Sequence, residues 1–215
     1  MKTKFFLTLA IAIGTTVATQ AQTTFGIRGG VNFQNINGKE ADGGDLDYKI
    51  KTGFSAGVNA EIPVGDGFYV QPGVLFSQKG AKLDDDLRIN LSYIEVPVNF
   101  LYKPELGTGK LLLGFGPYLG VAVGGSIKSD DSDEDIDFKF KSKVTTAEYL
   151  TDGPYLRRFD AGGNLLVGYE FSNKLSFQLN AQLGLLNINP EIEDADDNDG
   201  KWKNTGFGLS LGYRF

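Results

Sequence analysis

The chain ends with Thr205-Gly-Phe-Gly-Leu-Ser-Leu-Gly-Tyr-Arg-Phe215, in which large apolar residues alternate without a break with small or polar ones. Successive side chains of a β-strand point to opposite faces, so this pattern predicts a strand with one apolar and one polar face. The apolar face carries Phe207, Leu209, Leu211, Tyr213 and Phe215. Such a strand needs either a protein core or lipid against that face.

Seven upstream segments show the same alternation. With the last segment, the predicted strands are 24–34, 52–62, 68–78, 90–102, 110–124, 156–170, 174–186 and 204–215. The apolar faces carry no charge, whereas the opposite faces are rich in glycine, amides and serine, which are too small and polar to form a core. The polar faces are therefore expected to line an interior, and the apolar faces to meet lipid. The sequence predicts an all-β fold, an eight-stranded antiparallel up-and-down transmembrane β-barrel.

The predicted connections alternate in length. The long, charge-rich ones are 35–51, 79–89, 125–155 and 187–203, and the short ones are 63–67, 103–109 and 171–173. An up-and-down barrel with short periplasmic turns, long outer loops and both termini on the short-turn side requires this alternation.

Three prolines, Pro72, Pro97 and Pro117, lie inside predicted strands, and each removes a backbone donor, so we expect bulges or register changes there. A second irregularity is that four leucines face the polar side in this register. They are Leu75, Leu101, Leu112 and Leu166. Either these leucines fill a narrow interior or the register slips at a bulge.

The amino terminus has the pattern of an export signal: Lys2 and Lys4, a short apolar stretch, then small residues up to Ala21. We predict a cleavable signal peptide over 1–21, whose apolar stretch is too short to span a bilayer comfortably, and one barrel domain over 22–215. Losing the signal changes the formal net charge from −6 to −8. An acidic chain is a poor candidate for binding nucleic acid.

Five segments carry a resemblance to a known family. They are Phe25-Gly-Ile-Arg-Gly-Gly-Val-Asn-Phe33, Gln71-Pro-Gly-Val-Leu-Phe-Ser-Gln-Lys-Gly80, Tyr93-Ile-Glu-Val-Pro-Val-Asn-Phe-Leu-Tyr-Lys103, Gly114-Phe-Gly-Pro-Tyr-Leu-Gly120 and Gly212-Tyr-Arg-Phe215. Over essentially the whole mature chain, the sequence resembles the PorT-like, porin-family outer-membrane β-barrel domain. The resemblance implies an eight-stranded barrel in the cell outer membrane. It brings no catalytic residues, and the secretion-related role of the namesake is not carried over.

Charged residues on the polar faces form a candidate lumenal cluster. They are Arg28, Glu61, Glu95, Glu170 and Arg214. All but Glu95 are expected near the periplasmic mouth, where Arg28, Arg214 and Glu61 can form ion pairs. The cluster is either a polar gate in a narrow channel or a structural plug, and the narrow interior of an eight-stranded barrel favours the plug.

Catalysis is not expected. The chain has no Cys and no His, which removes thiolate and Ser-His chemistry. Glu95, in mid-strand, and Asp160, near the outer end of its strand, are expected to be too far apart in height for a paired-carboxylate hydrolase. No catalytic residue, metal or cofactor is predicted.

Two acidic stretches, 130–137 and 191–200, are interpreted as solvated surface loops. Carboxylates can bind divalent cations, but Gly200 and Thr205 depart from the spacing of an EF-hand that begins at Asp194. Weak cation bridging to lipopolysaccharide is left open.

Three functions remain open. The first is a structural or loop-mediated role in the outer membrane, with lipid, lipopolysaccharide and proteins bound by the acidic extracellular loops as partners. The second is a narrow pore for ions or small solutes. The third is a soluble periplasmic lipocalin-like carrier, which would need its apolar face inward.

Overall fold

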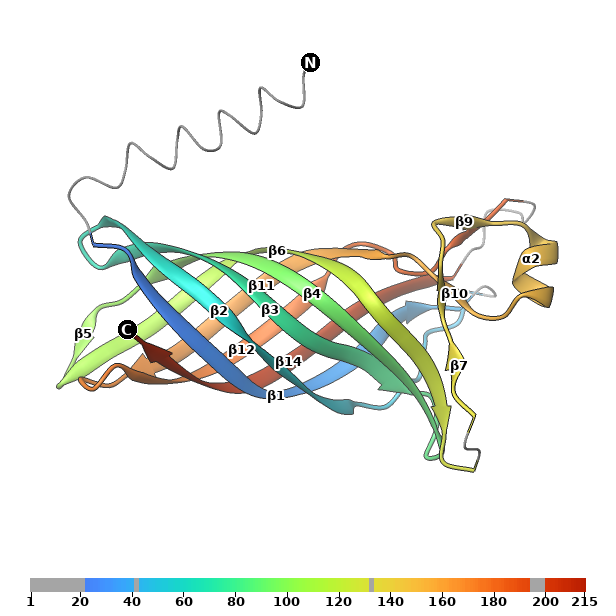
Figure 1. Cartoon of the computed structure of the whole chain (residues 1–215), viewed down its shortest axis with the longest axis horizontal. Coiled ribbons are helices and arrows are strands. Elements are labelled where there is room, and N and C mark those ends of the chain that lie inside the picture. The colour runs from blue at the N-terminus through green and yellow to red at the C-terminus, as the bar shows by residue number, and fades with distance from the viewer. Residues whose placement is uncertain (1–21, 41–42, 132–133, 194–199) are drawn as a thin grey trace, which may run out of the picture.

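A computed structural model describes residues 22–40, 43–131, 134–193 and 200–215, and eight long strands in it close into an antiparallel barrel (Figure 1). The strands are β1 (Thr24–Lys39), β2 (Lys51–Gly65), β3 (Phe68–Lys82), β4 (Leu87–Tyr102), β6 (Gly109–Ser129), β11 (Phe159–Glu170), β12 (Leu175–Gly184) and β14 (Lys201–Arg214). Each pairs with its neighbour, β14 pairs with β1, and β11 pairs with both β6 and β12. The predicted eight-stranded barrel is confirmed. The predicted signal peptide, 1–21, lies outside the described residues and stays a prediction.

The orientation of the two faces is confirmed as well. Phe207 and Leu211 of the last strand are 49% and 58% exposed, and apolar residues from all eight strands form a continuous outward belt. The interior at the same level holds buried amides and charges such as Gln71, Glu95 and Asp160. A lipocalin-like carrier with an apolar cavity requires the reverse arrangement.

The three connections predicted to be short lie at one end of the barrel, and the longest loops lie at the other (Figure 1). The short-turn end has turns at 66–67 and 171–174 and the small strand β5 (Glu105–Leu106). Pairing of Gly26 with Arg214 brings the start of β1 and the end of β14 to this end.

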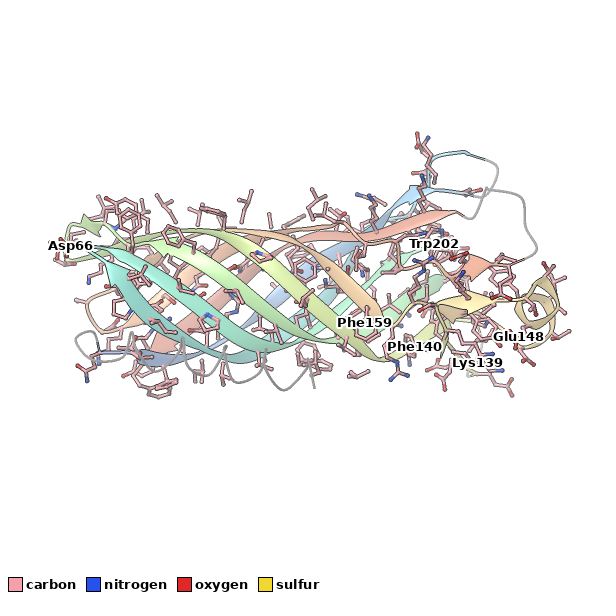
Figure 2. The ribbon with its side chains drawn as sticks, turned by 90° about the horizontal axis from the view of Figure 1, so that it is seen from above. Asp66, Lys139, Phe140, Glu148, Phe159 and Trp202 are labelled. Carbon is pink, nitrogen blue, oxygen red and sulfur yellow. The ribbon has the colours of Figure 1, made fainter. Side chains whose placement is uncertain are left out.

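The long-loop end carries the remaining small elements. They are β7 (Ile136–Asp137), β8 (Lys139–Phe140), β9 (Lys143–Val144), α2 (Thr146–Thr151), β10 (Tyr155–Leu156) and β13 (Glu191–Ile192). Figure 2 shows Asp66 and Glu148 at the two extremes of the molecule. No helix in the described ranges is long and apolar enough to cross a membrane.

One predicted connection is wrong. Residues 79–89 were expected to form a long loop, but β3 continues to Lys82, β4 begins at Leu87, and only 83–86 form the turn. The strands extend beyond the apolar belt, where outward residues such as Asn90 are polar because they meet water. The loss of apolar residues on the outer face marks the end of the belt and not the end of the strand.

The bulges predicted at the strand prolines are also wrong. The β3–β4 register is the same on both sides of this region, with Pro72 opposite Val98 and Leu75 opposite Glu95. The β4–β6 register likewise continues from the Pro97–Tyr118 pair toward Phe100 and Phe115. A missing N–H removes a hydrogen bond but adds no residue, and only an extra residue shifts the register.

The register shifts lie elsewhere, between Pro63 and Gly65 in β2 and between Ser92 and Tyr93 in β4. At the second shift, Tyr93 pairs with Ala122 while Ser92 pairs with Gly124, which leaves one extra residue in β6. Inward positions of β6 therefore change from Tyr118, Gly120 and Ala122 to Gly125 and Ile127. This bulge turns Ile127 toward the interior and Ser126 and Lys128 toward water.

The four leucines that face the polar side do fill the interior. Leu75, Leu101, Leu112 and Leu166 are buried, and the last three pack together against Tyr69. Their inward orientation needs no register slip.

Candidate functional site

Near the short-turn end, four charged side chains form what we call the short-turn cluster: Glu61, Lys103, Glu170 and Arg214. Arg214 Nη2 donates to Glu61 Oε1 at 2.6 Å, and Lys103 Nζ donates to Glu61 Oε2 at 2.8 Å. Lys103 also reaches both carboxylate oxygens of Glu170, at 3.0 and 2.8 Å. The cluster thus joins the ends of β2, β4, β11 and β14 across the lumen with two positive and two negative charges.

Amides extend this cluster toward the middle of the barrel. Gln71 donates to Glu61 Oε1 at 3.2 Å, and Asn99 donates to Gln71 at 3.3 Å. The Lys103 ammonium also lies 5.2 Å from the ring centre of Tyr69. Buried carboxylates are stable only when charge and hydrogen bonds compensate them, and here both do so.

Closer to the long-loop end, a second group of charged side chains lies inside the barrel. We call it the central cluster, and it consists of Lys79, Glu95 and Asp160. Lys79 Nζ lies 2.5 Å from Glu95 Oε1 and 3.0 Å from Asp160 Oδ2, and all three side chains are at most 2% exposed. Tyr118 donates its hydroxyl to Asp160 at 3.2 Å, and Asn204 donates its amide at 2.9 Å. The Lys79 ammonium lies 4.3 Å from the ring centre of Tyr118. Residues from β3, β4, β6, β11 and β14 thereby fill one cross-section of the barrel.

The structure divides the predicted cluster. Glu61, Glu170 and Arg214 come together through Lys103, whereas Glu95 belongs to the central cluster. Arg28 was expected among the short-turn charges, and this expectation is wrong, since no ion pair links it to another described residue. It lines a cavity of about 30 Å³ that Glu95 also lines. A cavity of this size has room for about one or two water molecules.

The expected separation of Glu95 from Asp160 is wrong too. Both residues pair with Gly120 on the strand between them, so they lie at the same level of the sheet. Barrel strands are tilted and staggered, and position along one strand therefore does not give height relative to another. Lys79 Nζ pairs with both carboxylates, which makes the group a buried ion cluster.

Sequence reasoning missed Lys79 and Lys103 because both were placed in connections. A signal was present: Gln71, Gly73, Leu75, Ser77 and Lys79 keep the inward period of two along β3. Lys103 continues the inward series of β4 by one step beyond its last residue. Extending the alternation past the apolar belt identifies both lysines.

At the long-loop end the interior changes from polar to apolar. Nine buried residues form what we call the apolar cap: Ile36, Ala81, Ile89, Leu91, Tyr93, Ala122, Phe138, Leu156 and Ile188. Phe138, Leu156 and Ile188 come from the loops, and the other six come from barrel strands. Partly buried residues, including Phe140 and Trp202, pack around them (Figure 2). The loops are thus held over the mouth of the barrel by a small hydrophobic core.

Two short parallel strand pairs order the loops: β8–β10 lies within the loop between β6 and β11, and β9–β13 joins that loop to the one between β12 and β14. Lys141–Glu148 and Lys143–Glu191 ion pairs, at 2.9 and 2.8 Å, reinforce them on the surface. The pKa of Glu148 is lowered by the Lys141 ammonium and by a hydrogen bond from the Thr145 backbone. Within the described residues, no group of three or more acidic side chains is arranged to hold a metal ion, and 194–199 lie outside them.

A closed eight-stranded barrel with an apolar outer belt and a charged interior defines the class of outer-membrane β-barrel proteins. Residues 20–189 match the family described as "Outer membrane protein beta-barrel domain". The chain belongs to this family, and its location is the outer membrane. The narrower PorT-like relationship is not part of this match and stays a prediction. No curated protein matches the chain.

Solved structures with a similar fold include Ail, the attachment invasion locus protein of Yersinia pestis, at 14% sequence identity and a TM-score of 0.44. Neisserial surface protein A (NspA) is similar at 12% identity and a TM-score of 0.48. In both comparisons 90% of this chain and 99% of the other chain are covered.

Proposed function

We propose that this protein is a non-enzymatic barrel that presents its extracellular loops to protein partners. The observation that carries the proposal is the apolar cap, because Phe138, Leu156 and Ile188 anchor two long loops on the barrel. Anchored loops lose less conformational entropy on binding than free ones do, so they suit recognition.

The outer loop surface has apolar residues that neither lipid nor the cap covers. Tyr149 and Leu150 of α2 are 39% and 77% exposed, and the helix buries no residue. Figure 1 shows α2 at the end of the molecule farthest from the short turns. Exposed apolar side chains surrounded by polar loops are typical of protein contact sites.

The loop charges suggest the character of the partner. Asp130, Asp131, Asp135 and Asp137 of the described acidic stretch are exposed, and negative surfaces attract positively charged partners at low ionic strength. We therefore propose a partner with a basic surface and an apolar contact for Leu150.

Pore activity is the less favoured function, since the two ion clusters, the lumenal leucines and the apolar cap fill successive levels of the interior. Reconstituted in planar bilayers, the protein should give no discrete openings. Regular single-channel steps from the pure protein would favour the pore.

Site-specific photocrosslinking on intact cells tests the loop role. A photoreactive residue at position 150 should give a covalent protein adduct that weakens as salt is raised. The same residue at position 201, on the rim of β14, serves as the matched control. Equal labelling from both positions, or none from position 150, would contradict a role for α2 in partner binding.

A further inference from the structure

A basic groove lies on the outer wall of β2, β3, β4 and β6 at the long-loop end. Its volume is about 670 Å³, and its charged lining residues are Lys51, Lys82, Arg88, Lys128 and Asp137. Four cations thus face one carboxylate, in a protein whose overall charge is negative. Gln78, Asn90 and Ser92 provide further polar groups along the groove.

The groove begins where the apolar belt ends. On these strands the last outward apolar residues are Phe76, Ile94 and Val123. Farther along these strands toward the long-loop end, the next outward-facing polar residues are Gln78, Ser92 and Ser126. All three line the groove. Lipid headgroups lie immediately beyond the hydrocarbon core, so the groove is at their level on the extracellular side.

Two of the four cations have no ion-pair partner among the described residues. Arg88 pairs with Asp130, and Lys128 pairs with Asp135 at 2.5 Å. Lys51 and Lys82 form no ion pair with any described residue. Lys51 is only 6% exposed, and among the described residues its ammonium has one long hydrogen bond, 3.5 Å to the carbonyl oxygen of Lys79.

A buried ammonium without a carboxylate is costly, and an anionic ligand would remove that cost. We propose that the groove binds the phosphate group of an anionic lipid of the outer leaflet. Phosphate oxygens accept charge-assisted hydrogen bonds from lysine and arginine, and the lipid's acyl chains can lie along the apolar belt directly below. Lys51 and Lys82 are the primary phosphate ligands. Arg88 and Lys128 add to the positive electrostatic potential of the groove.

The test uses the purified full chain in neutral maltoside micelles with a dye-labelled lipid A that carries its phosphates. Fluorescence anisotropy should show saturable binding, and Lys51→Gln/Lys82→Gln should weaken it roughly tenfold or more through lost charge-assisted hydrogen bonds. Lys201→Gln/Lys203→Gln removes the same charge from the rim of β14 outside the groove and should leave the affinity within about twofold. Lys82→Gln alone provides a milder variant in case the Lys51 change affects folding.

Two further arms identify the source of the phosphate. Dephosphorylated lipid A with the same acyl chains should bind weakly, and inorganic phosphate at equal concentration should not displace the labelled lipid. Equal weakening by the two double variants, no weakening by the groove variants, or equal binding of the dephosphorylated lipid would overturn the proposal. Full displacement by inorganic phosphate would assign the site to a soluble anion and would also overturn it.

Discussion

Lys79 Nζ lies 2.5 Å from Glu95 Oε1 inside the barrel, and both side chains are almost completely removed from solvent. Asp160 provides a second carboxylate at 3.0 Å, and Arg28 provides a second positive charge near Glu95. A buried ion pair adds modest net stability, because desolvation offsets attraction, but removing one partner leaves an uncompensated charge. The central cluster therefore tolerates a charge-balanced replacement far better than replacement of one member alone.

Lys79→Met tests this coupling. The substitution leaves Glu95 and Asp160 buried without their shared cation, and it should lower the free energy of unfolding by about 3 to 5 kcal/mol. Urea unfolding in micelles, followed by the loss of heat-modifiable migration on a gel, measures the change.

A double variant with Asp160→Asn added to Lys79→Met should recover most of that loss, since Arg28 and Glu95 then balance each other and no net charge is buried. Lys143→Met removes the surface pair with Glu191 and should cost less than about 1 kcal/mol. A double variant as unstable as Lys79→Met would show that packing, and not charge, dominates at this site.

The outward belt yields a second prediction. Leu209 lies opposite Val31 and Leu179 in the middle of β14. Leu209→Arg places a charge in the hydrocarbon and should destabilise the barrel by about 2 to 4 kcal/mol in a refolding titration in lipid vesicles. Asn37→Arg, on the outward face beyond the belt, should change stability by less than about 0.5 kcal/mol. Equal effects of the two substitutions would mean that Leu209 does not meet lipid.

The sequence predicts most of the barrel because lipid imposes one simple rule on every membrane-spanning strand: its outward-facing side chains must be apolar. Residues 204–215 obey this rule throughout, and the structure places β14 at Lys201–Arg214. Above the belt the rule reverses: Ile36, Ile89 and Leu91 point inward into the apolar cap. If strands are located only by their outward apolar residues, they are predicted to end where the apolar belt ends. For this reason the sequence pattern predicts a loop at 79–89.

The lumenal site was only partly predictable, for a different reason. Inward orientation follows from the period of two, so Glu61, Glu95 and Arg214 are identifiable from sequence. Their partners depend on the stagger between strands, which local sequence does not specify. That stagger brings Asp160 level with Glu95 and places Lys103 between Glu61 and Glu170.

A third prediction concerns the apolar cap. Leu156 is fully buried there, so Leu156→Ala should cost about 2 to 5 kcal/mol of local stability through lost burial and a residual cavity. The extracellular loops should be cleaved faster by added protease, while the barrel keeps its resistance. Leu150→Ala, at a 77% exposed position of α2, should leave the cleavage rate unchanged. Unaltered cleavage of the Leu156 variant would mean that the cap does not hold the loops.

The last prediction concerns the pH dependence of α2, which begins with a capping box between Thr145 and Glu148. The Lys141 ammonium, first, and the Thr145 backbone N–H, second, lower the pKa of Glu148 from its ordinary value of 4.5. For a carboxylate with a lowered pKa in the folded state, the stabilisation is present above the unfolded pKa and is lost as pH falls through the folded one.

The helix should therefore remain capped near neutral pH and loosen only in acid below pH 4.5. An NMR titration of the Glu148 side-chain carboxyl carbon checks this, and Lys141→Met should move its midpoint upward toward the ordinary value. Lys143→Met, which removes the neighbouring loop ion pair, is the matched control and should leave the Glu148 midpoint unchanged. An upward shift of equal size in both variants would mean that general loop charge, and not the 2.9 Å contact with Lys141, sets the protonation of Glu148.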